Sequence, residues 1–236
     1  MKRIFLAICL CVASSPISAM AQDEGMSEVI VTAMRRESDT FDERVPAVGL
    51  KRVADFAVQE VSITGDTRDA GKRIAEVYQM IENAIRLAPK HGVQLASGQR
   101  TVEPLTLQNY KSLALNGAGR PDTSRAVFLI KVPLSGPTSG VVAEKKIADF
   151  IKAVEPVGRA EFGETDDLTL SVVAPDQYRG AVADAIAEDA RSMAAKLGPD
   201  YGVEIEGLNR PVEWTRASLS EVLLYIPYKL VVVPKR

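Results

Sequence analysis

The stretch Asp167–Leu208, DLTLSVVAPDQYRGAVADAIAEDARSMAAKLGPDYGVEIEGL, decides the fold. It predicts a strand, a long alanine-rich helix and a return strand. The apolar residues of the helix recur at spacings of three and four, which places them on one face. They are Val182, Ile186, Ala190, Met193 and Leu197. The Gly198-Pro199 pair is expected to end the helix, and the apolar strand Leu168–Val173 is the expected floor beneath it.

The N-terminal residues 1–21 have the pattern of a cleavable secretory signal peptide. Lys2 and Arg3 precede an apolar run, Ile4–Ala13, and small residues surround the expected cleavage site after Ala21. The run is too short to favour a membrane span. We therefore expect a periplasmic protein, with association with the outer membrane left open. Both cysteines lie in this segment, so the mature chain has no disulfide and depends on its core.

Composition narrows the classes of function. Without residues 1–21 the chain keeps 27 basic and 31 acidic side chains, and no basic patch indicates nucleic acid. One histidine, His91, and no mature cysteine exclude a zinc site and a Cys-His nucleophile. Serine-lysine or paired-carboxylate catalysis stays open, because those residues converge only in three dimensions. We predict no catalytic, cofactor-binding or metal-binding residues and no cofactor.

Residues 22–52 are expected to form a flexible N-terminal arm that carries one ordered strand. The run Glu28–Ala33, followed by Arg35-Arg36-Glu37, resembles the TonB box of TonB-dependent outer-membrane receptors. The resemblance implies that this strand pairs with the TonB protein through its backbone. Its residues are Glu28, Val29, Ile30, Val31, Thr32 and Ala33. The other interpretation is an ordinary N-terminal strand or tail, since no receptor barrel follows.

A folded unit is expected from Val53 onward. Its first strand changes phase near Gln59-Glu60, which suggests a bulge. The next helix has an apolar stripe at Ala70, Ile74, Val77, Ile81, Ile85 and Ala88. Two strands, Leu105–Leu115 and Arg125–Leu134, are predicted on either side of the loop Asn116–Ser124.

The remaining chain predicts one more helix, an acidic turn and two final strands. The helix covers Val142–Val154, and the acidic residues of 159–167 favour a solvated turn. The strands are Val203–Trp214 and Glu221–Val233. The last is apolar on both faces and contains Pro227, which points to a sheet edge or bulge. We therefore predict a homo-oligomer edge, with burial inside the monomer as the alternative, at Leu223, Leu224, Tyr225, Ile226 and Tyr228.

The order of elements resembles the SIMPL-domain family of bacterial envelope proteins. The strand-helix opening Phe56–Ile85 and the stretch Ala181–Ile205 carry the resemblance, and the expected strands Leu105–Leu115 and Arg125–Leu134 also occupy the place that the family gives them. It implies an α+β fold of two β-α-β lobes with antiparallel-rich sheets and long amphipathic helices across residues 53–236. It also implies a non-enzymatic envelope protein; some members form large rings, and some are linked to envelope or oxidative stress protection.

Three functions therefore remain open at this point. The first is a self-assembling envelope protein of SIMPL type that works by binding or scaffolding. The second is an accessory to TonB-dependent uptake, which pairs with TonB through Glu28–Ala33. The third is an unrecognised hydrolase, for which we expect a deep pocket with convergent polar groups.

Overall fold

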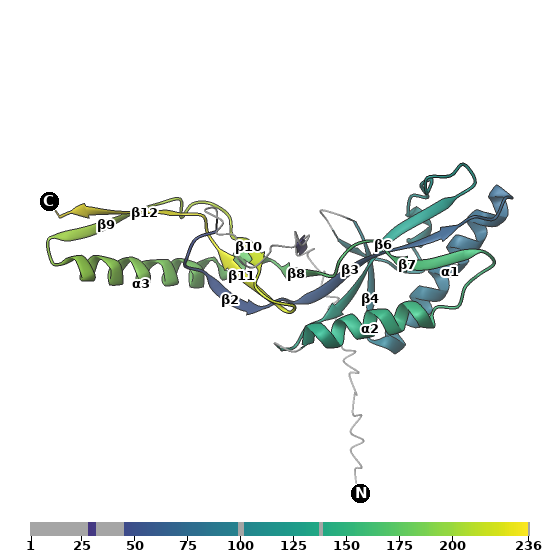
Figure 1. The fold of residues 1–236 in the computed structure, drawn as a ribbon, viewed down its shortest axis with the longest axis horizontal. Coiled ribbons are helices and arrows are strands. Elements are labelled where there is room, and N and C mark those ends of the chain that lie inside the picture. The colour runs from purple at the N-terminus through teal and green to yellow at the C-terminus, as the bar shows by residue number, and fades with distance from the viewer. Residues whose placement is uncertain (1–27, 32–44, 99–101, 137–138, 236) are drawn as a thin grey trace, which may run out of the picture.

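The computed structural model describes residues 28–31, 45–98, 102–136 and 139–235 (Figure 1). The expected signal peptide, Thr32 and Ala33 lie outside these residues. Within them the protein is α+β, and each pairing between named strands is antiparallel. The expected α+β class is therefore confirmed. No helix in the described part of the chain is long and apolar enough to cross a membrane.

The largest sheet is built around β3 (Phe56–Gly65), which is paired on both sides. On one side lie β6 (Ser124–Pro133), β4 (Gln94–Ser97) and β5 (Glu103–Pro104). On the other side lie β7 (Ala160–Glu164) and β8 (Thr169–Val173), and β1 (Glu28–Val31) completes this edge beyond β8. The expected strand Arg125–Leu134 corresponds to β6. Since β7 occupies most of the segment 159–167, the turn expected there was wrong, whereas its acidic residues Glu161, Glu164, Asp166 and Asp167 are exposed, as expected.

Two helices cover one face of this sheet. The helix α1 (Ala70–His91) begins at Asp69, whose carboxylate accepts a hydrogen bond from the backbone of Lys72 at 2.7 Å, and ends at Gly92 with φ of 63°. The helix α2 (Ser139–Ala153) packs beside it. Both bury apolar side chains against β3 and β6: Ala57, Val61, Ile63, Val77, Ile81, Phe128, Ile130, Ile147 and Phe150. The expected stripe of α1 is buried at Val77, Ile81 and Ala88 and half-buried at Ile85, but Ala70 is exposed and Ile74 is 40% exposed.

The bulge expected in β3 near Gln59-Glu60 is replaced by an irregularity in the strands that pair with β3 on one side, β7 and β8. Val61 lies opposite Glu164 of β7, and Val58 lies opposite Thr169 of β8. Two residues of β3 therefore face four residues of the partner, 165–168. The pairing of β3 with β6 continues through this region without interruption. The irregularity is a break between β7 and β8, and the expected bulge in β3 is not there.

A second, smaller lobe is formed by three strands and the start of α3. Its strands are β2 (Leu50–Val53), β11 (Glu221–Tyr225) and β10 (Glu213–Arg216), with β11 in the middle. A 3-10 turn, η2 (Pro175–Tyr178), leads into α3 (Arg179–Leu197). Their core includes Leu170, Val172, Val182, Ile186, Val222, Leu224 and Ile226. Because Leu50 already belongs to β2, ordered structure starts before the expected boundary at residue 53.

The last part of the fold projects away from both lobes (Figure 1). It consists of the distal half of α3 and a two-stranded ribbon of β9 (Tyr201–Glu206) and β12 (Lys229–Pro234). We call this part the stem. The two final strands of the sequence prediction were thus each too long. Both are split, so that β10 and β11 belong to the second lobe whereas β9 and β12 form the stem.

One further prediction was wrong. The segment Leu105–Leu115 contains turns and a 3-10 helix, η1 (Tyr110–Ser112), where a strand was expected. Asn109 explains the turn, because its side-chain oxygen accepts a hydrogen bond from the backbone of Thr106 at 2.7 Å and its amide donates to the carbonyl of Pro104 at 2.8 Å. Local side-chain bonds of this kind compete with a strand ladder.

Candidate functional site

The N-terminal strand β1 pairs with the edge of β8. Glu28, Val29, Ile30 and Val31 lie opposite Val173, Val172, Ser171 and Leu170 in that order. Four residues of the TonB-box-like segment are therefore extended and engaged strand on strand within their own chain. The structure brings them together with a sheet edge that sequence analysis had not linked to them.

The direction of the backbone groups in β8 follows from the neighbouring contacts. The carbonyl of Ser171 accepts from the backbone of Asp55 at 2.9 Å, and the N–H of Val173 donates to the Asp55 carboxylate at 2.8 Å. Both groups therefore point to the β3 side. Since backbone groups alternate along an antiparallel ladder, Leu170 and Val172 point to β1. Their partners Val31 and Val29 face β8, whereas Glu28 and Ile30 present their N–H groups to the open side.

Asp55 joins the two lobes at this place. Besides its contacts with β8, its carbonyl accepts from the backbone of Leu134 at 3.0 Å, and its carboxylate pairs with Arg52 at 2.8 Å. The residue thus connects β2, the end of β6 and β8. Sequence analysis missed it, because a single aspartate between two apolar strands carries no recognisable pattern.

The stem leaves apolar side chains exposed. On α3 only Val182, Ile186 and Ala190 are buried, whereas Met193 is 44% and Leu197 53% exposed. No residue of β9 or β12 is fully buried, and Tyr201 is 42% exposed. The two strands and the part of α3 beyond Ala190 therefore bury no side chain completely between them in the described residues. The predicted apolar face of α3 is therefore buried only as far as Ala190.

The residues predicted as an oligomer edge lie mainly inside the monomer. Leu224 and Ile226 are fully buried and Tyr225 is 6% exposed, while Leu223 and Tyr228 are half-buried. Their strand β11 is paired on both sides, with β10 and β2. Burial within the monomer, the alternative interpretation, describes these residues. Exposed large apolar side chains lie on the stem, at Met193, Leu197 and Tyr201, and also outside it, at Val141 and Val142 of α2 and at Leu219.

A cavity of about 440 Å³ lies where the stem meets the second lobe. Its lining carries two acids, Glu206 and Glu213, and two bases, Arg210 and Lys229, all exposed. Tyr228 also lines it, and burial, with a smaller effect of Asp189, raises the pKa of this phenol. The charges balance, and none is buried. The lining therefore carries four exposed charged groups beside the Tyr228 phenol.

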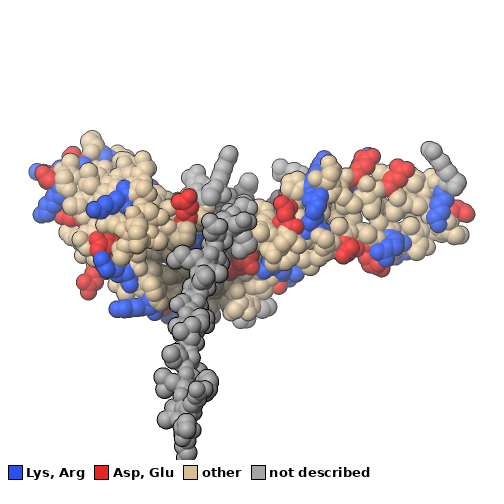
Figure 2. Space-filling model, turned by 180° about the vertical axis from the view of Figure 1, so that it is seen from behind, with Lys and Arg blue, Asp and Glu red and all other residues tan. Residues whose placement is uncertain are grey.

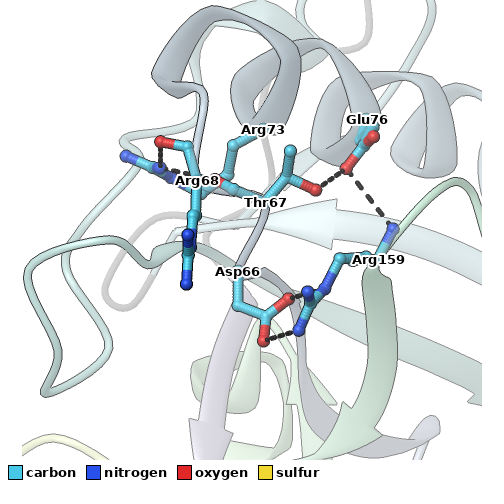
Figure 3. Close-up of polar contacts among 6 residues, drawn as sticks. All are labelled: Asp66, Thr67, Arg68, Arg73, Glu76 and Arg159. Atoms are coloured by element: carbon cyan, nitrogen blue, oxygen red, sulfur yellow. Dashed lines mark hydrogen bonds and ion pairs between the residues drawn. The ribbon is translucent and has the colours of Figure 1, made fainter.

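A cluster of polar and charged side chains lies at the turn between β3 and α1 (Figure 3). Arg159 grips Asp66 through two hydrogen bonds of 2.7 and 2.9 Å. The hydroxyl of Thr67 donates to Glu76 at 2.5 Å, and the backbone N–H of Arg159 donates to the same carboxylate at 3.4 Å. The Thr67 bond is the main cause that lowers the pKa of Glu76.

The same cluster holds a buried arginine. Arg73 donates to the hydroxyl of Ser124 at 3.0 Å and to the carbonyls of Thr67 and Arg68 at 2.7 and 3.3 Å. These hydrogen bonds from the Arg73 guanidinium hold the β3–α1 turn against the first residue of β6. Because these side chains satisfy one another, the cluster fastens the α2–β7 connection to the β3–α1 turn, and we assign it a structural role.

The single histidine also has a packing role. The ring of His91 contacts the ring of Phe150 edge to face, with centroids 5.7 Å apart, at the C-terminal end of α1. Among the described residues, no three His, Cys, Asp or Glu side chains lie together in a way that could hold a metal ion.

Comparison with known proteins adds little to this picture. No family model matches the sequence, and no curated protein matches it. Among solved structures, an amidase of the hydantoinase/carbamoylase family from Burkholderia phymatum is similar at 15% identity and a TM-score of 0.28. The similarity covers 59% of this chain and 36% of that one, and it is too low to carry an argument.

Proposed function

We propose that this chain is an exported, non-enzymatic envelope protein of SIMPL type, and that it acts by self-assembly through its stem. The observation that carries the proposal is the half-covered apolar surface of the stem. Met193 and Leu197 continue the buried face of α3, yet 44% and 53% of their surface stays exposed. A second copy supplies the same kind of surface and so covers them.

Three other observations support this class. The signal-peptide pattern of residues 1–21 favours the periplasm. The α+β architecture with antiparallel sheets agrees with the family resemblance in its coarse features. Acidic and basic side chains are interspersed over the face of the molecule in Figure 2 rather than gathered into a patch of one sign. The family resemblance extends the proposal to protection of the envelope under stress.

The experiment for this proposal is the solution mass of the mature chain, residues 22–236, measured by light scattering with and without residues 22–46. Assembly through the stem predicts a multimer in both forms, because the stem lies in the folded part. A monomer in both forms would contradict the proposal.

A second candidate, TonB engagement, is favoured by the strand state of β1. Glu28–Val31 is extended and already pairs antiparallel with another strand, which is the mode that a TonB box uses. Because β1 occupies β8 in this chain, engagement of TonB requires its release. A peptide of residues 22–46 is expected to bind TonB, and Val31→Pro, which deletes a backbone donor, is expected to abolish binding. Unchanged binding of the Val31→Pro peptide would remove this candidate.

A further inference from the structure

The side of β8 that faces away from β3 is buried only when another strand pairs with it. Leu170, Ser171 and Val172 are 1%, 0% and 0% exposed, and β3 pairs with only one side of this strand. On the other side the backbone groups of Leu170 and Val172 have β1 as their partner. A buried apolar strand that loses its neighbour becomes an open edge, and open edges pair readily with other strands.

The strand that covers this edge is short and lies far along the chain from β2, the next strand that the structure describes. It has four residues, and eighteen residues, 32–49, separate it from β2 along the chain. An extended chain of that length spans up to roughly 60 Å at about 3.3 Å per residue. The connection therefore does not oblige Glu28–Val31 to pair with the β8 of its own chain.

We propose that the β8 edge is a strand-exchange site, which accepts Glu28–Val31 of a second copy of this chain. The strand of a second copy has the same sequence as the strand that occupies the edge in this structure. It can therefore pair in the same register, with Val29 opposite Val172 and Val31 opposite Leu170. The proposal deepens the self-assembly proposed above and rests on it, since contacts between stems bring donor strands close to neighbouring edges.

The mature chain allows a direct test, because Cys9 and Cys11 both fall within residues 1–21 and leave it without cysteine. Ile30 and Ser171 lie directly opposite each other, within the Cα separation of roughly 4.5–5.5 Å that a disulfide accepts. Mature chains carrying Ile30→Cys alone and Ser171→Cys alone are purified separately, mixed, refolded together from urea and oxidised. We expect a disulfide-linked dimer that contains one chain of each kind.

The controls use the alternation of backbone groups in β1. Val31→Pro added to the Ile30→Cys chain removes a donor that faces β8, and the dimer is expected to disappear. Glu28→Pro removes a donor on the open side at the first residue of the strand, where proline is tolerated, and the dimer is expected to persist. Val172→Cys in place of Ser171→Cys shifts the cysteine to the opposite face, and we expect no dimer.

The outcomes separate exchange from assembly in general. A chain carrying both cysteines that cross-links only within itself, with no dimer from the mixture of single variants, would overturn strand exchange. Absence of any cross-link in the double variant would overturn it too, because β1 then does not occupy β8. In either case a multimer seen by light scattering would leave assembly through the stem standing. If the mixed single variants form the dimer but light scattering shows the unlinked mature chain to be a monomer, strand exchange would stand and assembly through the stem would be contradicted.

Discussion

At the scale of single residues, Gly158 shows how the polar cluster constrains the backbone. Its φ of 59° lies in the left-handed region, and an added Cβ would lie 2.2 Å from the carboxylate of Glu76. Gly119 also has a positive φ, 79°, but an added Cβ there meets nothing within 4 Å. An alanine at Gly119 therefore incurs only the cost of the left-handed backbone, whereas an alanine at Gly158 also clashes with Glu76.

We expect Gly119→Ala to lower the free energy of unfolding by about 1–2 kcal/mol, which is the ordinary cost of a left-handed alanine. Gly158→Ala is expected to cost more, because Glu76 must also leave its bonds with Thr67 and Arg159. Urea unfolding followed by circular dichroism measures both. If both substitutions lower the free energy of unfolding by the same amount, Glu76 moves away from the new Cβ at no cost in stability, which would contradict this expectation.

Glu76 also predicts a dependence of stability on pH. Its pKa is lowered in the folded protein, chiefly by the Thr67 hydroxyl, relative to the ordinary value of 4.5. A lowered pKa stabilises the fold above the unfolded value, and this contribution is lost as the pH falls through the folded pKa.

Thr67→Val removes the donor, so we expect the pKa of Glu76 to rise toward 4.5 and acid unfolding to begin at a higher pH. An NMR titration of Glu76 measures the first effect, and unfolding by acid measures the second. Thr123→Val is the matched control, because the Thr123 hydroxyl bonds only to backbone groups of Ala118 and Arg120. A Glu76 pKa unaffected by Thr67→Val would contradict this explanation.

At the scale of elements, the stem makes the clearest prediction. Met193 on the stem and Ile74 on α1 are exposed to a similar extent, 44% and 40%. A lysine at Met193 places a charge on the surface proposed to meet a second copy, whereas a lysine at Ile74 places one on the solvent side of a body helix. We expect Met193→Lys to lower the solution mass and Ile74→Lys to leave it unchanged. Equal masses for the two variants would show that Met193 is not at an interface.

The helix α3 and the final strands show which elements a sequence pattern predicts and which it does not. The 3.6-residue spacing and the Gly-Pro stop predict α3 well, because both signals are local. The strands Val203–Trp214 and Glu221–Val233 were predicted as continuous, because apolar alternation does not say to which sheet a strand belongs. Their splitting into β9, β10, β11 and β12 depends on contacts between distant parts of the chain.

Acidic composition misled the prediction for residues 159–167 in a similar way. Charged residues usually indicate a solvated turn, but β7 lies beside the central strand β3, which supplies a complete ladder for it. The pairing of β1 with β8 was also outside the reach of the sequence. The TonB-box-like pattern marks a strand that can pair, yet it carries no information about its partner within the chain.

At the scale of the whole molecule, the fold combines two packed lobes with a stem that is not fully covered (Figure 1). The lobes hold the large buried side chains and are joined at Asp55 and β8. The stem has no comparable core, so its stability depends on α3 and on whatever covers Met193 and Leu197. The proposed self-assembly would give the stem this cover, and the proposed exchange of β1 would add a second link between copies.

The measurement that tests this account most directly is light scattering of the mature chain, of the same chain without residues 22–46, and of Met193→Lys. Assembly through the stem predicts a multimer for the first two and a smaller mass for the third. A monomer in all three forms, or a multimer that Met193→Lys leaves intact, would contradict the proposal that the stem is the interface.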